Sequence, residues 1–185
     1  MSPPLKLCVL TGVPGSGKSS AAALIAHDIP GNWSVVHADD FIGPTFEWFR
    51  PKPWVEIRQY HTIFAGWSAG WHLSQGRNVL VEGHVKDGKE LRHLVQSTKV
   101  RYDGPIDRKV IWLDGDTEEI VARLTANPFR EPSWTGPDRP AKFRFWITEW
   151  AVDPTLADVV VDSRGKSPTK VALEVAGEFG IPFRP

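Results

Sequence analysis

Short runs of apolar residues alternate along the chain with longer segments in which apolar and polar residues mix at helical spacing. Such runs are typical of strands buried on both faces of a parallel sheet. The five runs lie at residues 5–11, 33–38, 77–82, 109–113 and 158–162. The segments between and after them predict helices at 19–28, 55–75, 87–97, 117–126, 141–150 and 167–179. This alternation predicts an α/β domain of three layers with a five-stranded parallel sheet in the middle.

The segment at 55–75 has a regular helical pattern. Its apolar residues recur at steps of three and four, which places them on one face of a helix. These residues are Ile57, Tyr60, Phe64, Trp67 and Trp71. We expect Trp67 and Trp71 to lie in the core. The stretch before this helix, 41–54, is rich in proline and aromatic residues without periodicity, and it predicts a structured loop.

Composition narrows the class of protein. A chain of 185 residues is long enough for one domain with a substantial core, so we expect a single domain over 1–185, as a monomer or a homodimer. The 22 basic and 22 acidic residues balance, whereas a protein that binds long nucleic acid usually carries a basic excess. The lone Cys8 cannot form an internal disulfide, and no run resembles a signal peptide or a membrane span. We therefore expect a cytoplasmic protein without a membrane or long nucleic-acid partner.

Residues 12–19, GVPGSGKS, match the pattern G-x-x-x-x-G-K-[ST] in full, between a predicted strand and a predicted helix. Glycines let the backbone wrap so that successive N–H groups point at phosphate oxygens, at the positive end of the following helix. In this pattern the lysine reaches the β- and γ-phosphates and the serine hydroxyl ligates Mg²⁺. The sequence therefore predicts ATP and Mg²⁺ as cofactors. The predicted binding residues are Gly12, Val13, Pro14, Gly15, Ser16, Gly17, Lys18, Ser19 and Ser20.

With this loop and its order of elements, the chain resembles the small P-loop kinases related to nucleoside, gluconate, shikimate and adenylate kinases, and the kinase domain of polynucleotide kinases. In such kinases the strand after the first helix ends in an aspartate that accepts the proton of the substrate hydroxyl. Here His37-Ala38-Asp39-Asp40-Phe41 resembles the D-[DS]-[FY] signature of uridine, nicotinamide riboside and polynucleotide kinases. The resemblance implies a P-loop NTPase fold, Asp39 as catalytic base and Asp40 as a Mg²⁺-water or substrate contact.

Two residues at the end of the third predicted strand extend this site. Glu82 resembles the strand-end glutamate with which some of these kinases hold Mg²⁺ through water, and strand ends converge on the ligand crevice of a parallel sheet. His84 follows two residues later, and we expect it to be a pocket wall that contacts the substrate.

Arginines are expected because negative charge spreads over the transferred phosphoryl oxygens in the transition state. Related kinases supply them from a lid, and the proline-rich segment 127–140 with its leading helix resembles one. We expect Arg123 and Arg130 to act there, whereas Arg139 and Arg144 fit a solvated surface equally well. Arg164, after the last strand, resembles the residue that packs on adenine in relatives, and a surface turn is the alternative of equal weight.

The acceptor is predicted to lie against the aromatic segment that follows Asp39. Flat apolar side chains suit a nucleobase, a sugar ring or an aromatic drug. The predicted substrate contacts are Asp39, Phe41, Trp48, Arg50, Trp54 and His84.

These observations predict an ATP- and Mg²⁺-dependent phosphotransferase that acts on a hydroxyl group of a small molecule, nucleoside-like or sugar-like. An antibiotic-modifying phosphotransferase stays open, as does a polynucleotide 5′-hydroxyl kinase, although the latter would require a basic channel. A different class, a non-catalytic NTP-binding switch or regulatory ATPase, would keep the phosphate loop and would need no acceptor base.

Overall fold

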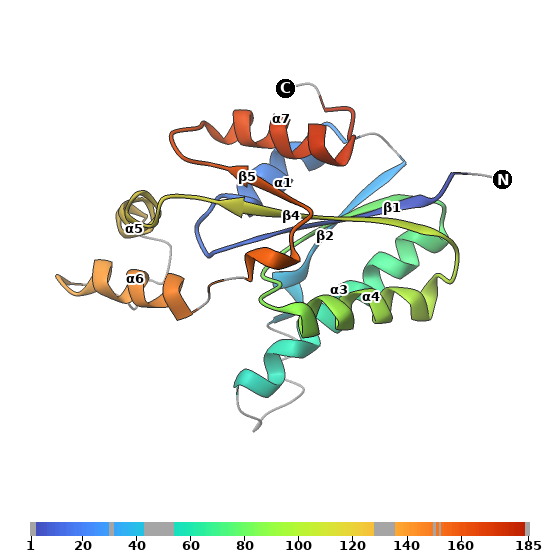
Figure 1. Cartoon of the computed structure of the whole chain (residues 1–185), viewed down its shortest axis with the longest axis horizontal. Helices are drawn as coiled ribbons and strands as arrows, with labels where there is room; N and C mark the ends of the chain where they lie inside the picture. Colours follow the sequence, from blue (N-terminus) through green and yellow to red (C-terminus); the bar gives the residue numbers. More distant parts are fainter. Residues whose placement is uncertain are drawn as a thin grey trace.

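The structure is a computed structural model, which describes residues 3–29, 32–42, 54–127, 136–149, 151 and 153–183, without the side chains of 54–59. Within this part of the chain, five parallel strands form one sheet in the order β2-β3-β1-β4-β5 (Figure 1). The strands are β1 (Leu5–Gly12), β2 (Trp33–His37), β3 (Asn78–Glu82), β4 (Ile106–Asp114) and β5 (Val159–Asp162). The predicted sheet is confirmed.

Helices cover both faces of this sheet (Figure 1). Cys8 and Leu10 of β1 pack with α1 (Lys18–His27) and α7 (Pro168–Phe179) on one face. Leu7 and Val9 point the other way and pack with α3 (Trp54–Ser74) and α4 (Gly88–Arg101). Because successive strand residues face opposite layers and both layers are apolar, β1 is apolar almost throughout. Full burial of each such side chain stabilises the fold by about 1.5–3 kcal/mol.

The contact between α3 and α4 uses glycines. A Cβ atom added at Gly66 would collide with the carbonyl oxygen of Leu94, and one at Gly70 with that of Thr98. The helices therefore approach too closely for larger side chains to lie between them. The small residues Ala65 and Ala69 are fully buried beside these glycines.

This packing makes one sequence prediction wrong. Trp67 and Trp71 are 42% and 56% exposed instead of lying in the core. The helix has two stripes at three- and four-residue spacing, one of small residues and one of aromatic residues. The small stripe faces α4 because of the close approach of the helices, which turns the two tryptophans outward.

The remaining helices differ modestly from the predicted ranges. α5 (Thr117–Ala126) matches, whereas α4 continues to Arg101 past its predicted end at 97. The Thr98 hydroxyl donates to the Leu94 carbonyl at 2.9 Å, so this polar side chain is satisfied inside the helix. α6 (Arg139–Glu149) begins before residue 141, since a proline is tolerated in the first turn of a helix.

α5 and α6 pack together through Ile120, Leu124, Phe143 and Ile147. Arg139 belongs to α6, so the helix takes the last two residues of the predicted lid 127–140, most of which lies outside the described residues. Two short 3₁₀ turns complete the described elements, η1 (Ala38–Phe41) and η2 (Pro154–Leu156). None of the described helices is long and apolar enough to cross a membrane.

Candidate active site

The phosphate loop lies between β1 and α1, at the carboxyl end of the sheet. Gly15 and Gly17 have φ angles of 80° and 102°, which residues other than glycine rarely adopt. Gly17 is also the N-cap of α1. A Cβ atom at Gly15 would also lie 2.9 Å from side-chain atoms of Ile120 and Leu124 on α5. The glycines therefore give the loop its curvature and let α5 pack against it.

Two polar side chains of the loop are buried. Lys18 is 7% exposed and its ammonium donates to the Val13 carbonyl at 3.0 Å. Ser16 is 1% exposed, and its hydroxyl has no hydrogen-bond partner among the described residues. Leaving a buried hydroxyl unsatisfied costs about 1–3 kcal/mol, and a phosphate oxygen that accepts its hydrogen bond would offset this cost. The loop thus fits a polyphosphate.

Glu82, at the end of β3, meets the serine that follows Lys18. Its side chain is 3% exposed, and the Ser19 hydroxyl donates to its Oε1 at 3.0 Å. His37 Nδ1 lies 3.0 Å from its other oxygen, Oε2. An ionised carboxylate can only accept, so the Nδ1–H of His37 donates. Both oxygens of this buried carboxylate are therefore held.

The Ser19 and Glu82 oxygens fit Mg²⁺, which prefers oxygen ligands and usually keeps several waters beside one or two carboxylates and substrate phosphates. Among the described residues, no three His, Cys, Asp or Glu side chains converge to form a metal site. A cation here would thus depend on a bound nucleotide for further ligands.

The turn that carries the predicted base lies next to Glu82. Asp39 and Asp40 are both in η1, directly after β2, and their side chains are exposed. A Cβ atom at Gly83 would lie 2.6 Å from that of Ala38, so the ends of β2 and β3 approach very closely. The structure therefore brings the two aspartates to the same end of the sheet as the phosphate loop.

Three described aromatic residues that follow these aspartates in the chain form a continuous group. The rings of Phe41 and Phe64 are stacked with centroids 6.4 Å apart, and Trp67 meets Phe64 edge-on at 5.4 Å. His84 is 7% exposed, and its carbonyl lies 3.3 Å from His61 Nε2. Trp48, Arg50 and the Trp54 side chain, also predicted as substrate contacts, lie outside the described residues.

Arg123 lies beside the phosphate loop. Its guanidinium donates to the Gly15 carbonyl at 3.4 Å and to Glu119 at 2.8 Å, one turn earlier on α5. Its proposed partner, Arg130, lies outside the described residues. Arg139 instead donates to the Asn127 carbonyl at 2.7 Å, so it connects the start of α6 to the end of α5.

Two further arginines form surface ion pairs. Arg144 donates to both carboxylate oxygens of Glu118, which lowers the pKa of that carboxyl group. Arg164 donates to Asp162 at 2.9 Å, and this hydrogen bond lowers the pKa of Asp162. The Arg164 side chain is 60% exposed, so it is held in place by the pair and open to solvent; its adenine contact stays a prediction.

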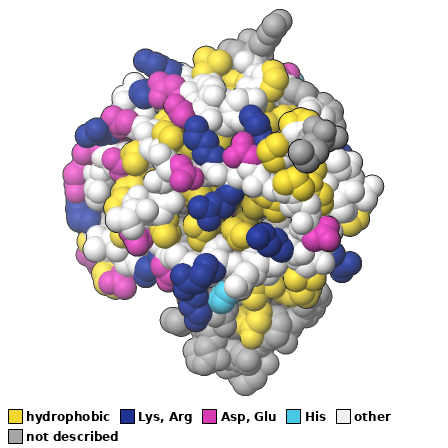
Figure 2. Space-filling view, turned by 45° about the vertical axis from the view of Figure 1, so that its right-hand side comes forward, with side chains coloured by type: hydrophobic (Ala, Val, Ile, Leu, Met, Phe, Trp, Pro, Cys, Tyr) yellow, Lys and Arg dark blue, Asp and Glu magenta, His cyan; other side chains and the backbone are white. Residues whose placement is uncertain are grey.

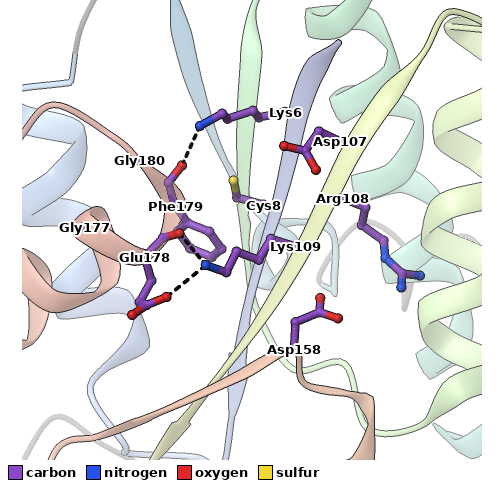
Figure 3. A pocket seen from close by; sticks show the side chains of 10 residues that line it. All are labelled: Lys6, Cys8, Asp107, Arg108, Lys109, Asp158, Gly177, Glu178, Phe179 and Gly180. Atoms are coloured by element: carbon purple, nitrogen blue, oxygen red, sulfur yellow. Dashed lines mark hydrogen bonds and ion pairs between the residues drawn. The ribbon is translucent and has the colours of Figure 1, made fainter.

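A hollow with a volume of about 430 Å³ lies at the opposite, amino end of the strands (Figure 3). Lys6 Nζ donates to the Phe179 carbonyl at 3.1 Å, and Lys109 Nζ donates to the Glu178 carbonyl at 2.7 Å. Both lysines thus satisfy carbonyls in the last turn of α7, the negative end of that helix. Figure 2 turns this side forward and shows Lys and Arg side chains among hydrophobic ones. These lysines therefore connect β1 and β4 to the end of α7.

Sequence reasoning missed His37. The residue stands directly opposite Glu82 in the β2–β3 register. His37 lies beside Glu82 because β2 and β3 are neighbours in the sheet. The sequence pattern did not specify this strand order. The only local signal was its place two residues before Asp39.

Comparisons with known proteins identify the fold. No family model and no curated protein matches the chain. Among solved structures, a sugar kinase from a Janibacter species is 18% identical with a TM-score of 0.63, over 97% of this chain and 96% of that one. The APS kinase of Mycobacterium tuberculosis, in complex with AMPPNP and APS, is 20% identical with a TM-score of 0.67, over 95% and 98%. The tunicamycin resistance protein of Deinococcus radiodurans is 12% identical with a TM-score of 0.63, over 99% of both chains. At these identities the likeness establishes the fold, which is that of the small P-loop kinases.

Proposed function

We propose that this protein is an ATP- and Mg²⁺-dependent phosphotransferase that moves the γ-phosphate to a hydroxyl group of a small molecule. The observation that carries the proposal is the convergence at one end of the sheet. Lys18 and Ser19 belong to a complete phosphate loop, the Ser19 hydroxyl donates to the buried Glu82 at 3.0 Å, and Asp39 lies on the adjoining turn. A nucleotide-binding switch would require the first two features and not the third.

Each side chain has a chemical role in this proposal. Asp39 accepts the proton of the acceptor hydroxyl as its oxygen forms the new bond to phosphorus and the bond to the ADP oxygen breaks. Lys18 and Arg123 stabilise the negative charge on the phosphoryl oxygens. Ser19 and Glu82 would hold Mg²⁺, which would offset the negative charge of the nucleotide phosphates. Asp39 is exposed and therefore accessible to an acceptor in solution.

The acceptor is nucleoside-like or sugar-like. Phe41 directly follows the two aspartates, and its ring stacks with Phe64. A flat apolar surface beside the catalytic base Asp39 suits the nucleobase of a nucleoside or the ring of a sugar. In both kinds of acceptor, a sugar hydroxyl lies close to an apolar face. The small anionic acceptors of other kinases in this group would instead require a cluster of basic side chains.

An antibiotic acceptor is the second candidate. Its support is the full-length similarity to the tunicamycin resistance protein of Deinococcus radiodurans, at 12% identity. An antibiotic with a sugar hydroxyl and an apolar body would use the same aromatic surface and the same base.

The test is ADP release from ATP and Mg²⁺ with a panel of nucleosides, sugars, aminoglycosides, tunicamycin and short 5′-hydroxyl oligonucleotides. Asp39→Asn is compared with the wild type and with Asp103→Asn, which changes an exposed aspartate at the amino end of the sheet. We expect one acceptor class to stimulate release, and Asp39→Asn to reduce it by about 10²–10⁴-fold, the usual contribution of a general base.

Each outcome has a clear meaning. A stimulating nucleoside, sugar or antibiotic identifies the acceptor class, and an oligonucleotide would replace the small-molecule acceptor. If nothing stimulates release and Asp39→Asn behaves as Asp103→Asn does, the phosphotransferase proposal is wrong and an NTP-binding switch is the better account.

A further inference from the structure

The carboxylate of Glu82 is held from two sides by residues of different elements. Ser19, in the first turn of α1, donates to Oε1 at 3.0 Å. His37, the last residue of β2, donates from Nδ1 to Oε2 at 3.0 Å. The β2–β3 register sets His37 directly beside Glu82. The imidazole is thus fixed by a strand and not by a loop.

The two contacts have different relations to the nucleotide site. Ser19 belongs to the phosphate loop, and its oxygen is a predicted Mg²⁺ ligand. His37 lies outside the loop and donates to the other carboxylate oxygen of Glu82, Oε2. A glutamate side chain has several rotatable bonds, and a single hydrogen bond leaves the carboxylate free to rotate about it. The second hydrogen bond, from His37, restricts that rotation.

Burial makes the second contact more consequential. The Glu82 side chain is 3% exposed, so water has little access to Oε2 if the imidazole is lost. A buried carboxylate oxygen without a donor would turn toward another donor, and the carboxylate would leave its position beside Ser19. The His37 side chain is 35% exposed and therefore forms the outer edge of this group.

We propose that His37 is a positioning residue that holds Glu82 for Mg²⁺. Partners in the outer shell of a metal site fix the orientation of the ligand that touches the ion, and their loss typically lowers metal affinity or activity by about 10–100-fold. The inference rests on the proposed nucleotide site. It adds that the Mg²⁺ response of nucleotide binding depends on the N–H group of a residue outside the phosphate loop.

The experiment measures ATP affinity by titration calorimetry, once with Mg²⁺ and once with EDTA, and takes the ratio of the two dissociation constants. His37→Leu removes the donor at similar volume, and His37→Asn keeps an N–H donor close to the position of Nδ1. His72→Leu is the matched control, because His72 Nδ1 lies 3.0 Å from the Ser34 hydroxyl, in another histidine contact to β2. Thermal unfolding of each variant verifies that it is folded.

We expect His37→Leu to reduce the Mg²⁺-dependent gain in affinity by about 10–100-fold with little change in EDTA, and His37→Asn to retain most of the gain. The control should keep the wild-type ratio. An unchanged ratio in His37→Leu would overturn the inference, as would equal losses in the leucine and asparagine variants. Wild-type protein that binds no ATP would contradict the proposed function itself.

Discussion

Lysines donate to backbone carbonyls at both ends of the sheet, and their partners differ in an instructive way. At the carboxyl end, Lys18 contacts the carbonyl of Val13, five residues earlier in the same loop. At the amino end, Lys6 contacts Phe179, 173 residues away, and Lys109 contacts Glu178, 69 residues away. A local contact holds little of the fold together and can be exchanged for a phosphate. The distant contacts connect β1 and β4 to the last helix, α7.

The surroundings of these lysines strengthen the contrast. Beside Lys18, the Ser16 hydroxyl is buried without a hydrogen-bond partner in the described chain. The carboxyl end of the sheet therefore has a hydrogen-bond donor that a polyanion could use. Around Lys109, the Glu178 carbonyl and carboxylate lie at 2.7 and 2.9 Å, so this ammonium already has partners within the protein (Figure 3). Substitutions at the two ends should therefore affect different properties.

The largest effect is expected from Lys18→Ala. Loss of its charge removes a stabilising interaction with the transferred phosphoryl group, and we expect turnover to fall by about 10³-fold or more, equivalent to about 4 kcal/mol. The melting temperature should change little, because the lost contact is local. Steady-state ADP release and calorimetric unfolding measure the two properties. A large loss of stability with retained turnover would reverse the comparison.

A smaller effect of the opposite kind is expected from Lys109→Met. The variant loses the hydrogen bond to the end of α7, and we expect the free energy of unfolding to fall by about 1 kcal/mol with unchanged turnover. Little of this comes from the half-exposed ion pair with Glu178, since solvent screens it. Urea unfolding measures the change.

The control for this stability measurement is Lys99→Met, which changes an exposed lysine on α4. Equal stabilities of the two variants would mean that Lys109 does not connect β4 to α7.

The smallest expected effect is on the reactivity of the Cys8 thiol, which lines the hollow at the amino end of the sheet. Burial raises the pKa of this thiol from 9.0 to about 12. We therefore expect negligible reaction with DTNB at pH 8 in the native protein and one reactive thiol in urea. The unfolded chain loses this proton first, so the thiol's contribution to stability is complete below pH 9 and declines as the pH rises toward 12.

Rapid and complete reaction of Cys8 in the folded protein would contradict this prediction. It would mean that the hollow at the amino end admits reagents to the sheet and is less tightly packed than the carboxyl end.

Local sequence signals predicted much of the site. The phosphate loop was identified because its glycines, lysine and serine are adjacent in the chain, and a contact within one loop needs no knowledge of strand order. Glu82 followed from its place at a strand end, and Asp39 from the resemblance to the D-[DS]-[FY] signature. The structure brings both to the loop's end of the sheet. Their catalytic and metal-binding roles stay predictions.

Contacts between distant residues escaped the sequence analysis. His37 contacts Glu82 only because β2 lies next to β3, and nothing in either strand specifies that neighbour. The orientation of α3 was wrong for a related reason. In α3, aromatic residues and small residues both recur at helical spacing. A prediction from hydrophobicity alone places the larger, aromatic side chains in the core.

By itself, the sequence determined the alternation of strands and helices, the sheet of parallel strands and the phosphate loop, because hydrophobic periodicity and glycine conformation act within a few residues. Only the tertiary structure decided which strands are neighbours, which stripe of α3 is buried and which lysines hold α7. Those features depend on how closely whole elements can approach: Gly66 and Gly70 admit the backbone of α4, and the tryptophans of α3 consequently face solvent.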